Sequence, residues 1–165
     1  MTTQNQNPET AINENDLAEE AIASELVEEA TSHEDVIETV ISSLDMEDTA
    51  MVNHSEDGIL WKFNYGSVEV FVQLTGESDE DLFTVWATVL PLPAKNEPKL
   101  MRRLLEMNWE GTFETCFGIF NDRVVVLSQR TVAELSPGEI SRAITLVATI
   151  ADDNDEAFQE EFGAD

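Results

Sequence analysis

The chain has 165 residues, of which 42% are apolar, and carries 35 acidic against 8 basic residues, a formal net charge of −27. This length and apolar content suffice for a single domain with its own core. The charge excludes nucleic acid and anionic membranes as natural partners, since their phosphates need lysine and arginine. It favours solubility, and it leaves open the electrostatic steering of a basic partner.

The expected compartment is the cytoplasm. A single cysteine, Cys116, excludes an internal disulfide and fits a reducing environment. The residues after Met1 are polar, without the basic and apolar regions of a signal peptide. No apolar run has the length of a transmembrane helix, so we expect no membrane span.

Residues 1–30 are predicted to form an acidic, mostly disordered N-terminal extension. Residues 1–16 contain almost nothing to bury. Residues 17–29 place apolar side chains at roughly helical spacing, beside a polar face that is entirely acidic. Because like charges repel along such a face, this segment is either a transient helix or one that docks on a partner or on the domain itself.

A single folded domain is predicted for residues 31–162. It begins with a helix whose apolar face consists of Val36, Ile37, Val40, Ile41 and Leu44. A polar loop follows at 45–58. Three strands with alternating apolar residues come next, at 59–64, 68–74 and 82–90.

Prolines 91 and 93 end the third strand, and a second helix is predicted for 96–108. Two strands, 112–120 and 123–132, then form a hairpin. Ser136 starts the last helix with a capping box, and we expect the acidic tail of this helix to fray. The order α-β-β-β-α-β-β-α defines an α+β domain, with helices packed on a twisted antiparallel sheet.

The aromatic residues of the strands fall into two groups. Alternation predicts Trp61, Phe63, Phe83 and Phe117 as core residues. Leu60, Phe71 and Trp86 fall on the opposite faces of their strands, and we assign them as candidate partner-binding residues. The alternative is that a helix or a dimer mate covers this second face.

Half of the basic residues gather in or beside the second helix: Lys95, Lys99, Arg102 and Arg103. The first interpretation is a solvated helix face with pairing between residues four apart. The second is a contact with an acidic surface, either of a client or of the N-terminal segment of a dimer.

The chain shows no pattern typical of catalysis or of cofactor or metal binding. His33, His54 and Cys116 have no zinc-like spacing, and Cys116 is expected to be a small buried apolar residue. The acidic run from Asp152 fails as an EF-hand, because alanine or phenylalanine stands where the loop needs glycine. There is no glycine-rich phosphate loop. We therefore predict a protein that is not an enzyme, without cofactor or metal.

Three segments carry a resemblance to a known family: LLEMN at 104–108, FGIFNDRVVVLSQRTVAEL at 117–135 and SPGEISRAITLVATIADDNDEAF at 136–158. With the order of elements, they resemble the bacterial type III secretion chaperone fold of the Tir chaperone and YbjN group, over about residues 32–160. The chain departs from this group in its acidic extension and in a hairpin turn without glycine. The resemblance implies a small acidic homodimer that binds an extended segment of a client protein.

The leading hypothesis is therefore a homodimeric, chaperone-like or adaptor protein. Its sheet and first helix would hold an extended or amphipathic client segment through apolar pockets and strand-edge hydrogen bonds. The alternative is a YbjN-type regulatory protein, acting in stress response or signalling without a dedicated client.

Overall fold

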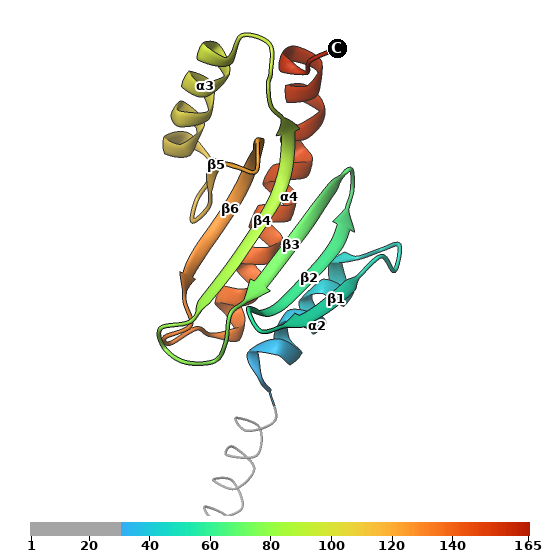
Figure 1. Cartoon of the computed structure of the whole chain (residues 1–165), viewed down its shortest axis with the longest axis vertical. Coiled ribbons are helices and arrows are strands. Elements are labelled where there is room, and N and C mark those ends of the chain that lie inside the picture. The colour runs from blue at the N-terminus through green and yellow to red at the C-terminus, as the bar shows by residue number, and fades with distance from the viewer. Residues whose placement is uncertain (1–30) are drawn as a thin grey trace, which may run out of the picture. The chain divides into compact units, whose positions relative to one another are not determined.

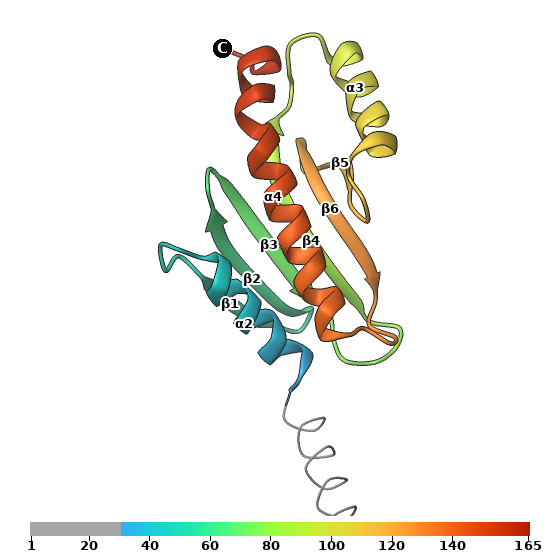
Figure 2. The same cartoon turned by 180° about the vertical axis from the view of Figure 1, so that it is seen from behind.

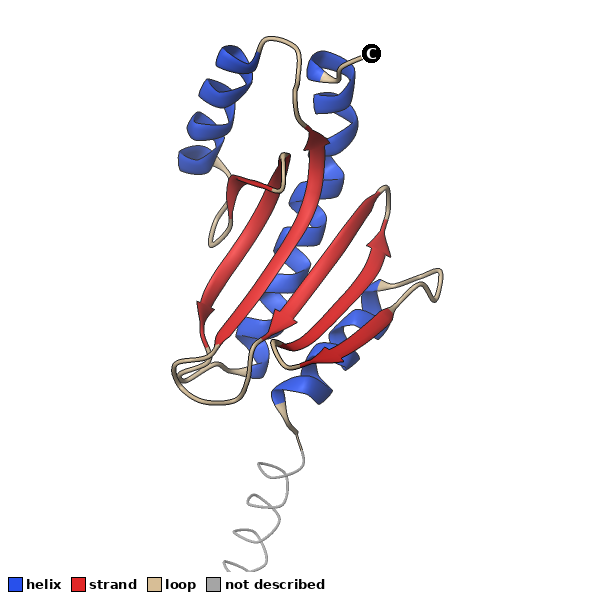
Figure 3. Ribbon diagram, in the orientation of Figure 1, coloured by secondary structure: helices blue, strands red, loops and turns tan. Residues whose placement is uncertain are grey.

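A computed structural model describes residues 31–165, and its folded unit spans His33–Asp165. The predicted extension of residues 1–30 lies outside the described residues. Figures 1 and 3 show the elements in chain order: α2 (His33–Leu44), β1 (Met51–Ser55), β2 (Gly58–Tyr65), β3 (Val68–Leu74), β4 (Leu82–Pro91), α3 (Glu97–Glu110), β5 (Cys116–Phe120), β6 (Arg123–Thr131) and α4 (Pro137–Phe162).

The strands form one antiparallel sheet in the order β1-β2-β3-β4-β6-β5. The α+β class and the predicted order of elements are confirmed, with one strand more. This strand, β1, occupies part of the predicted polar loop and pairs only with β2. All five of its residues are exposed, so it has no alternation of buried and exposed side chains that the sequence pattern would reveal.

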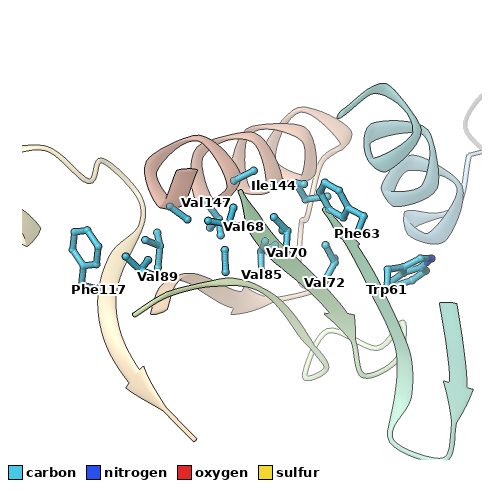
Figure 4. Packing of buried hydrophobic residues seen from close by; sticks show 14 of the residues in the cluster. Trp61, Phe63, Val68, Val70, Val72, Val85, Val89, Phe117, Ile144 and Val147 are labelled. Carbon is cyan, nitrogen blue, oxygen red and sulfur yellow. The ribbon is translucent and has the colours of Figure 1, made fainter. Parts of the chain in front are cut away.

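Helices α4 and α2 cover one face of the sheet, as Figure 2 shows. Figure 4 shows part of the core, in which valines from β3 and β4 meet Ile144 and Val147 of α4. The four predicted aromatic core residues are all buried, which confirms the assignment of this face. The core is continuous from Ile37 of α2 to Phe162 at the end of α4.

The first turn of α4 is fixed by the predicted capping box. Ser136 accepts a hydrogen bond from the Glu139 amide at 3.2 Å, and the Glu139 carboxylate accepts one from the Ser136 amide at 2.8 Å. Pro137 occupies the first helical position, where no amide hydrogen is needed. The cap therefore satisfies two amides that helix geometry leaves unpaired.

Ser136→Ala is expected to destabilise the protein by about 1 kcal/mol, because the Glu139 amide loses its acceptor. Urea unfolding followed by circular dichroism measures this change. Ser141→Ala, in the next turn of the same helix, is the matched control and should change stability by less than about 0.5 kcal/mol. Equal losses for the two variants would contradict a specific capping effect.

The end of α4 does not fray, contrary to the prediction. The helix continues to Phe162, and both Phe158 and Phe162 are fully buried. The Phe158 ring meets Phe117 of β5 edge to face, at 5.8 Å between centroids. The Lys95 amide donates a 2.8 Å hydrogen bond to the Phe162 carbonyl. Two buried aromatic rings outweigh the repulsion within the acidic run.

The segment between α3 and β5 also differs from the prediction, because β5 begins at Cys116 and not at Thr112. Residues 111–115 form a turn in which Thr112 and Thr115 are buried. The Thr115 amide and hydroxyl both donate to the Thr112 carbonyl, at 2.9 and 2.7 Å. Side chains that bond their own backbone in this way favour turns over strands.

His33 is half-buried, and its Nε2 lies 3.0 Å from the carbonyl oxygen of Leu135, just before α4. Within residues 31–165, no helix combines the length and the apolar character needed to cross a membrane.

Candidate partner-binding face

The face of the sheet opposite α4 carries a continuous row of aromatic rings, which we call the aromatic row: Phe71, Trp86 and Phe120. Phe71 and Trp86 are register partners on β3 and β4. Their rings stack at 5.2 Å between centroids, with an angle of 9°. Phe120, at the end of β5, meets Trp86 edge to face at 5.8 Å. Three strands therefore contribute one connected aromatic surface.

Strand register extends this row across the sheet. Trp86 pairs with Leu127 of β6, which in turn pairs with Cys116 of β5. A shallow groove of about 260 Å³ lies over Trp86, Leu127 and Phe120. Gly118 leaves room for the Leu127 side chain, because a Cβ at this position would lie 2.8 Å from Cδ2 of Leu127. Cys116, predicted to be buried, is half-buried instead, because strand register places it with Leu127 and Trp86 on the face of the sheet opposite α4.

Polar groups lie along one side of the aromatic row, and a charged pair lies at its β2 end. The next register row carries Leu60, Gln73, Thr84 and Gln129, and the Gln129 side-chain amide donates to the Thr84 hydroxyl at 3.0 Å. Lys62 lies over the Phe71 ring at 5.7 Å and pairs with Glu69 at 2.6 Å. The face thus offers an apolar centre with hydrogen-bonding groups at its border, the usual composition of a protein-binding surface.

The structure brings the predicted partner-binding residues together on one face. Leu60, Phe71 and Trp86 are each half-buried and alternate with the buried residues of their strands. Helices α2 and α4 lie on the other face of the sheet (Figures 1 and 2). Sequence reasoning missed Phe120 and Leu127. The signal was available in part, because the two-residue turn at Asn121-Asp122 fixes Phe120 opposite Arg123, and Leu127 follows from the same register.

The basic cluster pairs with acidic groups of the same chain. Lys99 and Arg103 both hold the Glu161 carboxylate near the end of α4, with Lys99 at 2.8 Å. Lys95 pairs with Asp165 at 3.0 Å. Arg102 pairs with Glu106, four residues on in α3, at 3.0 Å. The Arg103 guanidinium also lies over the Phe158 ring, at 5.2 Å. The contacts of Lys99 and Arg103 hold α3 against the end of α4.

The Glu161 pair has a defined pH dependence. The hydrogen bond from Lys99, with a further one from Arg103, lowers the pKa of the Glu161 carboxyl below its usual value. A lowered pKa in the folded state contributes stability above the unfolded pKa, and this contribution is lost as the pH falls through the folded value. The docking of α4 on α3 should therefore weaken in acid.

Glu161→Gln is expected to lower the melting temperature near pH 7, and the difference from wild type should shrink as the pH falls through the lowered pKa of the Glu161 carboxyl. Thermal unfolding at several pH values measures the difference. Glu160→Gln, one residue earlier on the exposed side of α4, serves as the control. A difference between Glu161→Gln and wild type that does not change with pH would contradict the ion pair.

The outer face of α3 forms a second exposed apolar surface. Leu105 is 71% exposed and Trp109, one turn on, is 91% exposed. Arg102 and Glu106 lie on the same stretch of the helix and together border a hollow with Leu105 and Trp109. An indole this exposed is rare in a monomeric protein and indicates a contact surface. Within the described residues, no group of three His, Cys, Asp or Glu side chains forms a metal site.

The chain has the α+β fold of secretion chaperone-like proteins, an antiparallel sheet backed on one face by helices. A family model described as "Putative bacterial sensory transduction regulator" matches residues 33–160, and the chain belongs to this family, YbjN. The predicted resemblance to the Tir chaperone and YbjN group is thereby confirmed.

Solved structures show the same fold at low sequence identity. One is a chain of the ExsC–ExsE complex, with a TM-score of 0.52 and 17% identity over 76% of this chain and 90% of that one. Another comes from the HopA1–SchA chaperone–effector complex, with a TM-score of 0.51 and 10% identity over 75% of this chain and 93% of that one. The search of curated proteins found no match.

Proposed function

We propose that the protein is a non-enzymatic, chaperone-like or adaptor protein that binds an extended segment of a client protein on the aromatic row. The observation that carries the proposal is the connected, uncovered surface of Phe71, Trp86 and Phe120. A monomeric protein gains little from aromatic rings held in water, whereas a bound apolar segment would bury them. The similar solved structure of a chaperone–effector complex supports this proposal.

The fold offers backbone groups beside this surface. Strands β1 and β5 are the two edges of the sheet, so each has one side without a neighbouring strand. Phe120 and Ile119, on edge strand β5, are about half exposed. A client segment that pairs with β5 would gain main-chain hydrogen bonds and place alternate side chains on the aromatic row.

Photo-crosslinking in the native host tests this proposal. A photo-crosslinking amino acid in place of Phe71 should capture a specific protein, and the same amino acid in place of Met46 should not. Met46 is the matched control because it is 89% exposed and lies on the loop after α2, away from the aromatic row. Trp86→Ser should abolish the capture while the protein remains folded. Identical crosslinking patterns from positions 71 and 46 would contradict the proposed function.

The same proposal includes a homodimer formed through the outer face of α3. A two-fold dimer brings the same patch of both copies together, so the patch must complement itself. Leu105 and Trp109 supply the apolar part. Arg102 and Glu106 supply opposite charges on one helix, which allows Arg102 of one copy to meet Glu106 of the other.

Trp109→Ser is expected to convert the dimer to a monomer, because the most exposed apolar group of the proposed interface is removed. Sedimentation equilibrium measures the mass of each form. Met46→Ser is the matched control and should remain dimeric. A monomeric wild type, or a dimeric Trp109→Ser variant, would count against this interface.

The family description favours the second candidate function, a regulator without a dedicated client. The two functions differ in what the aromatic row does. A regulator of this kind predicts no specific protein crosslinked from position 71, so the same experiment separates them.

A further inference from the structure

A second groove lies between the turn after α3 and the side of α4. It has a volume of about 620 Å³ and shares no residue with the groove on the aromatic row. We call it the α4 groove and define it by six of its residues: Met107, Glu110, Phe113, Leu146, Ile150 and Asp153. Four of these are apolar and two are acidic.

The apolar part is built around Phe113. The backbone of this residue is left-handed, with φ 52°, a conformation that a residue with a bulky side chain rarely adopts. The turn that imposes it is held by hydrogen bonds of Thr112 and Thr115. The residue is nevertheless 75% exposed. Backbone strain that the surrounding structure maintains is found mostly at functional sites. Such strain at an exposed aromatic residue therefore indicates a binding site.

On the other side of the groove, Leu146 and Ile150 extend the apolar surface along α4. They lie one turn apart, beside the core residues of this helix, and both are only partly buried. Met107, from the last turns of α3, completes the floor. A side chain of the size of leucine that entered here would contact three separate segments of the chain.

The acidic charge at the rim of the α4 groove favours a basic partner. Glu110 and Asp153 are both exposed, and no lysine or arginine lines the groove. The nearby Arg142 is already paired with Glu114, at 2.8 Å. A second copy of the chain is disfavoured here, because an isologous contact would place the acidic rims of the two copies against each other. A segment with lysine or arginine beside an apolar residue complements both features.

We propose that the α4 groove binds a basic amphipathic segment of a partner protein. An apolar side chain of the segment is seated between Phe113 and Ile150, and its basic side chains reach Glu110 and Asp153. This binding is separate from client binding on the aromatic row and does not depend on it.

An NMR titration tests the proposal. The probe is a synthetic helical peptide of leucine and lysine, with leucines one turn apart, and the control peptide carries glutamate in place of lysine. The lysine peptide should shift amide signals of residues 107–115 and 145–154 in a saturable way, whereas the glutamate peptide should not. Absence of a saturable shift in these two segments, or shifts centred on the aromatic row, would overturn the proposal.

Phe113→Gly separates a binding role from a structural one. Glycine adopts the left-handed conformation without strain, so the melting temperature should not fall below that of the wild type. The affinity for the lysine peptide should nevertheless fall roughly tenfold or more, as expected for a central aromatic contact. Met46→Ala should bind like the wild type.

Two further variants complete the test. Asp153→Asn should weaken binding of the lysine peptide and reduce its dependence on salt concentration. Phe120→Ala addresses the aromatic row: if it abolishes binding while Phe113→Gly does not, the α4 groove is not the site. If Phe113→Gly instead converts a dimer to a monomer in sedimentation, the groove is a contact between copies and the proposal is wrong.

Discussion

Phe158→Ala is expected to destabilise the protein by about 3–5 kcal/mol, the range for removing a fully buried aromatic ring from a core. The ring is fully buried between Phe117 and Phe162, at 5.8 and 6.2 Å between centroids, and Arg103 lies over it. Its loss leaves a cavity at the point where β5, α3 and α4 meet. The last turns of α4 should then separate from the sheet.

Urea unfolding gives the stability change, and hydrogen exchange of the α4 amides shows where the structure loosens. Glu156→Ala, two residues earlier and exposed, is the control and should change stability by less than about 0.5 kcal/mol. If Phe158→Ala unfolds at the wild-type urea concentration, the end of α4 is not part of the cooperative core.

The error in predicting this helix end has an identifiable cause. The run from Asp152 to Asp165 is dominated by acidic residues, and its charge suggests a solvated, fraying tail. Yet Ala151, Phe158 and Phe162 continue the spacing of the buried face of α4. Periodicity was the better guide here, because a few large buried rings offset many weak repulsions between exposed charges.

The sheet shows where sequence patterns suffice and where they do not. Strand β3 alternates strictly between buried and half-buried residues, so Phe71 was correctly placed opposite the core. Alternation within a strand cannot tell which residue of the next strand lies beside it. The stacking of Phe71 on Trp86 depends on the pairing of β3 with β4, which only the structure supplies.

The basic cluster illustrates the same limit at longer range. The concentration of positive charge at α3 is visible in the sequence, but its partner Glu161 is 58 residues from Arg103. The chain has 35 acidic residues, so charge alone does not indicate which of them pairs with Arg103. The packing of Phe158 and Phe162 under Arg103 and Lys99 decides the pairing.

Asn108→Ala is expected to lower the free energy of unfolding by about 2 kcal/mol. The substitution removes the side chain that bonds both the amide and the carbonyl of Phe117 in β5. Asn108 Oδ1 accepts a 2.7 Å hydrogen bond from the Phe117 amide, and its Nδ2 donates to the Phe117 carbonyl at 3.3 Å. One side chain of α3 thus binds β5 as a neighbouring strand would. Its own carbonyl also accepts from the Thr112 hydroxyl, which links this contact to the turn that presents Phe113.

Asn108→Asp is the informative companion variant, because it keeps the acceptor for the Phe117 amide but loses the donor. Its stability should fall between those of the wild type and Asn108→Ala. Amide signals of residues 111–115 should broaden in both variants, more strongly in Asn108→Ala. If the alanine variant unfolds at the wild-type urea concentration with these signals unchanged, the turn is ordered by Thr112 and Thr115 alone, and Asn108 does not hold α3 to β5.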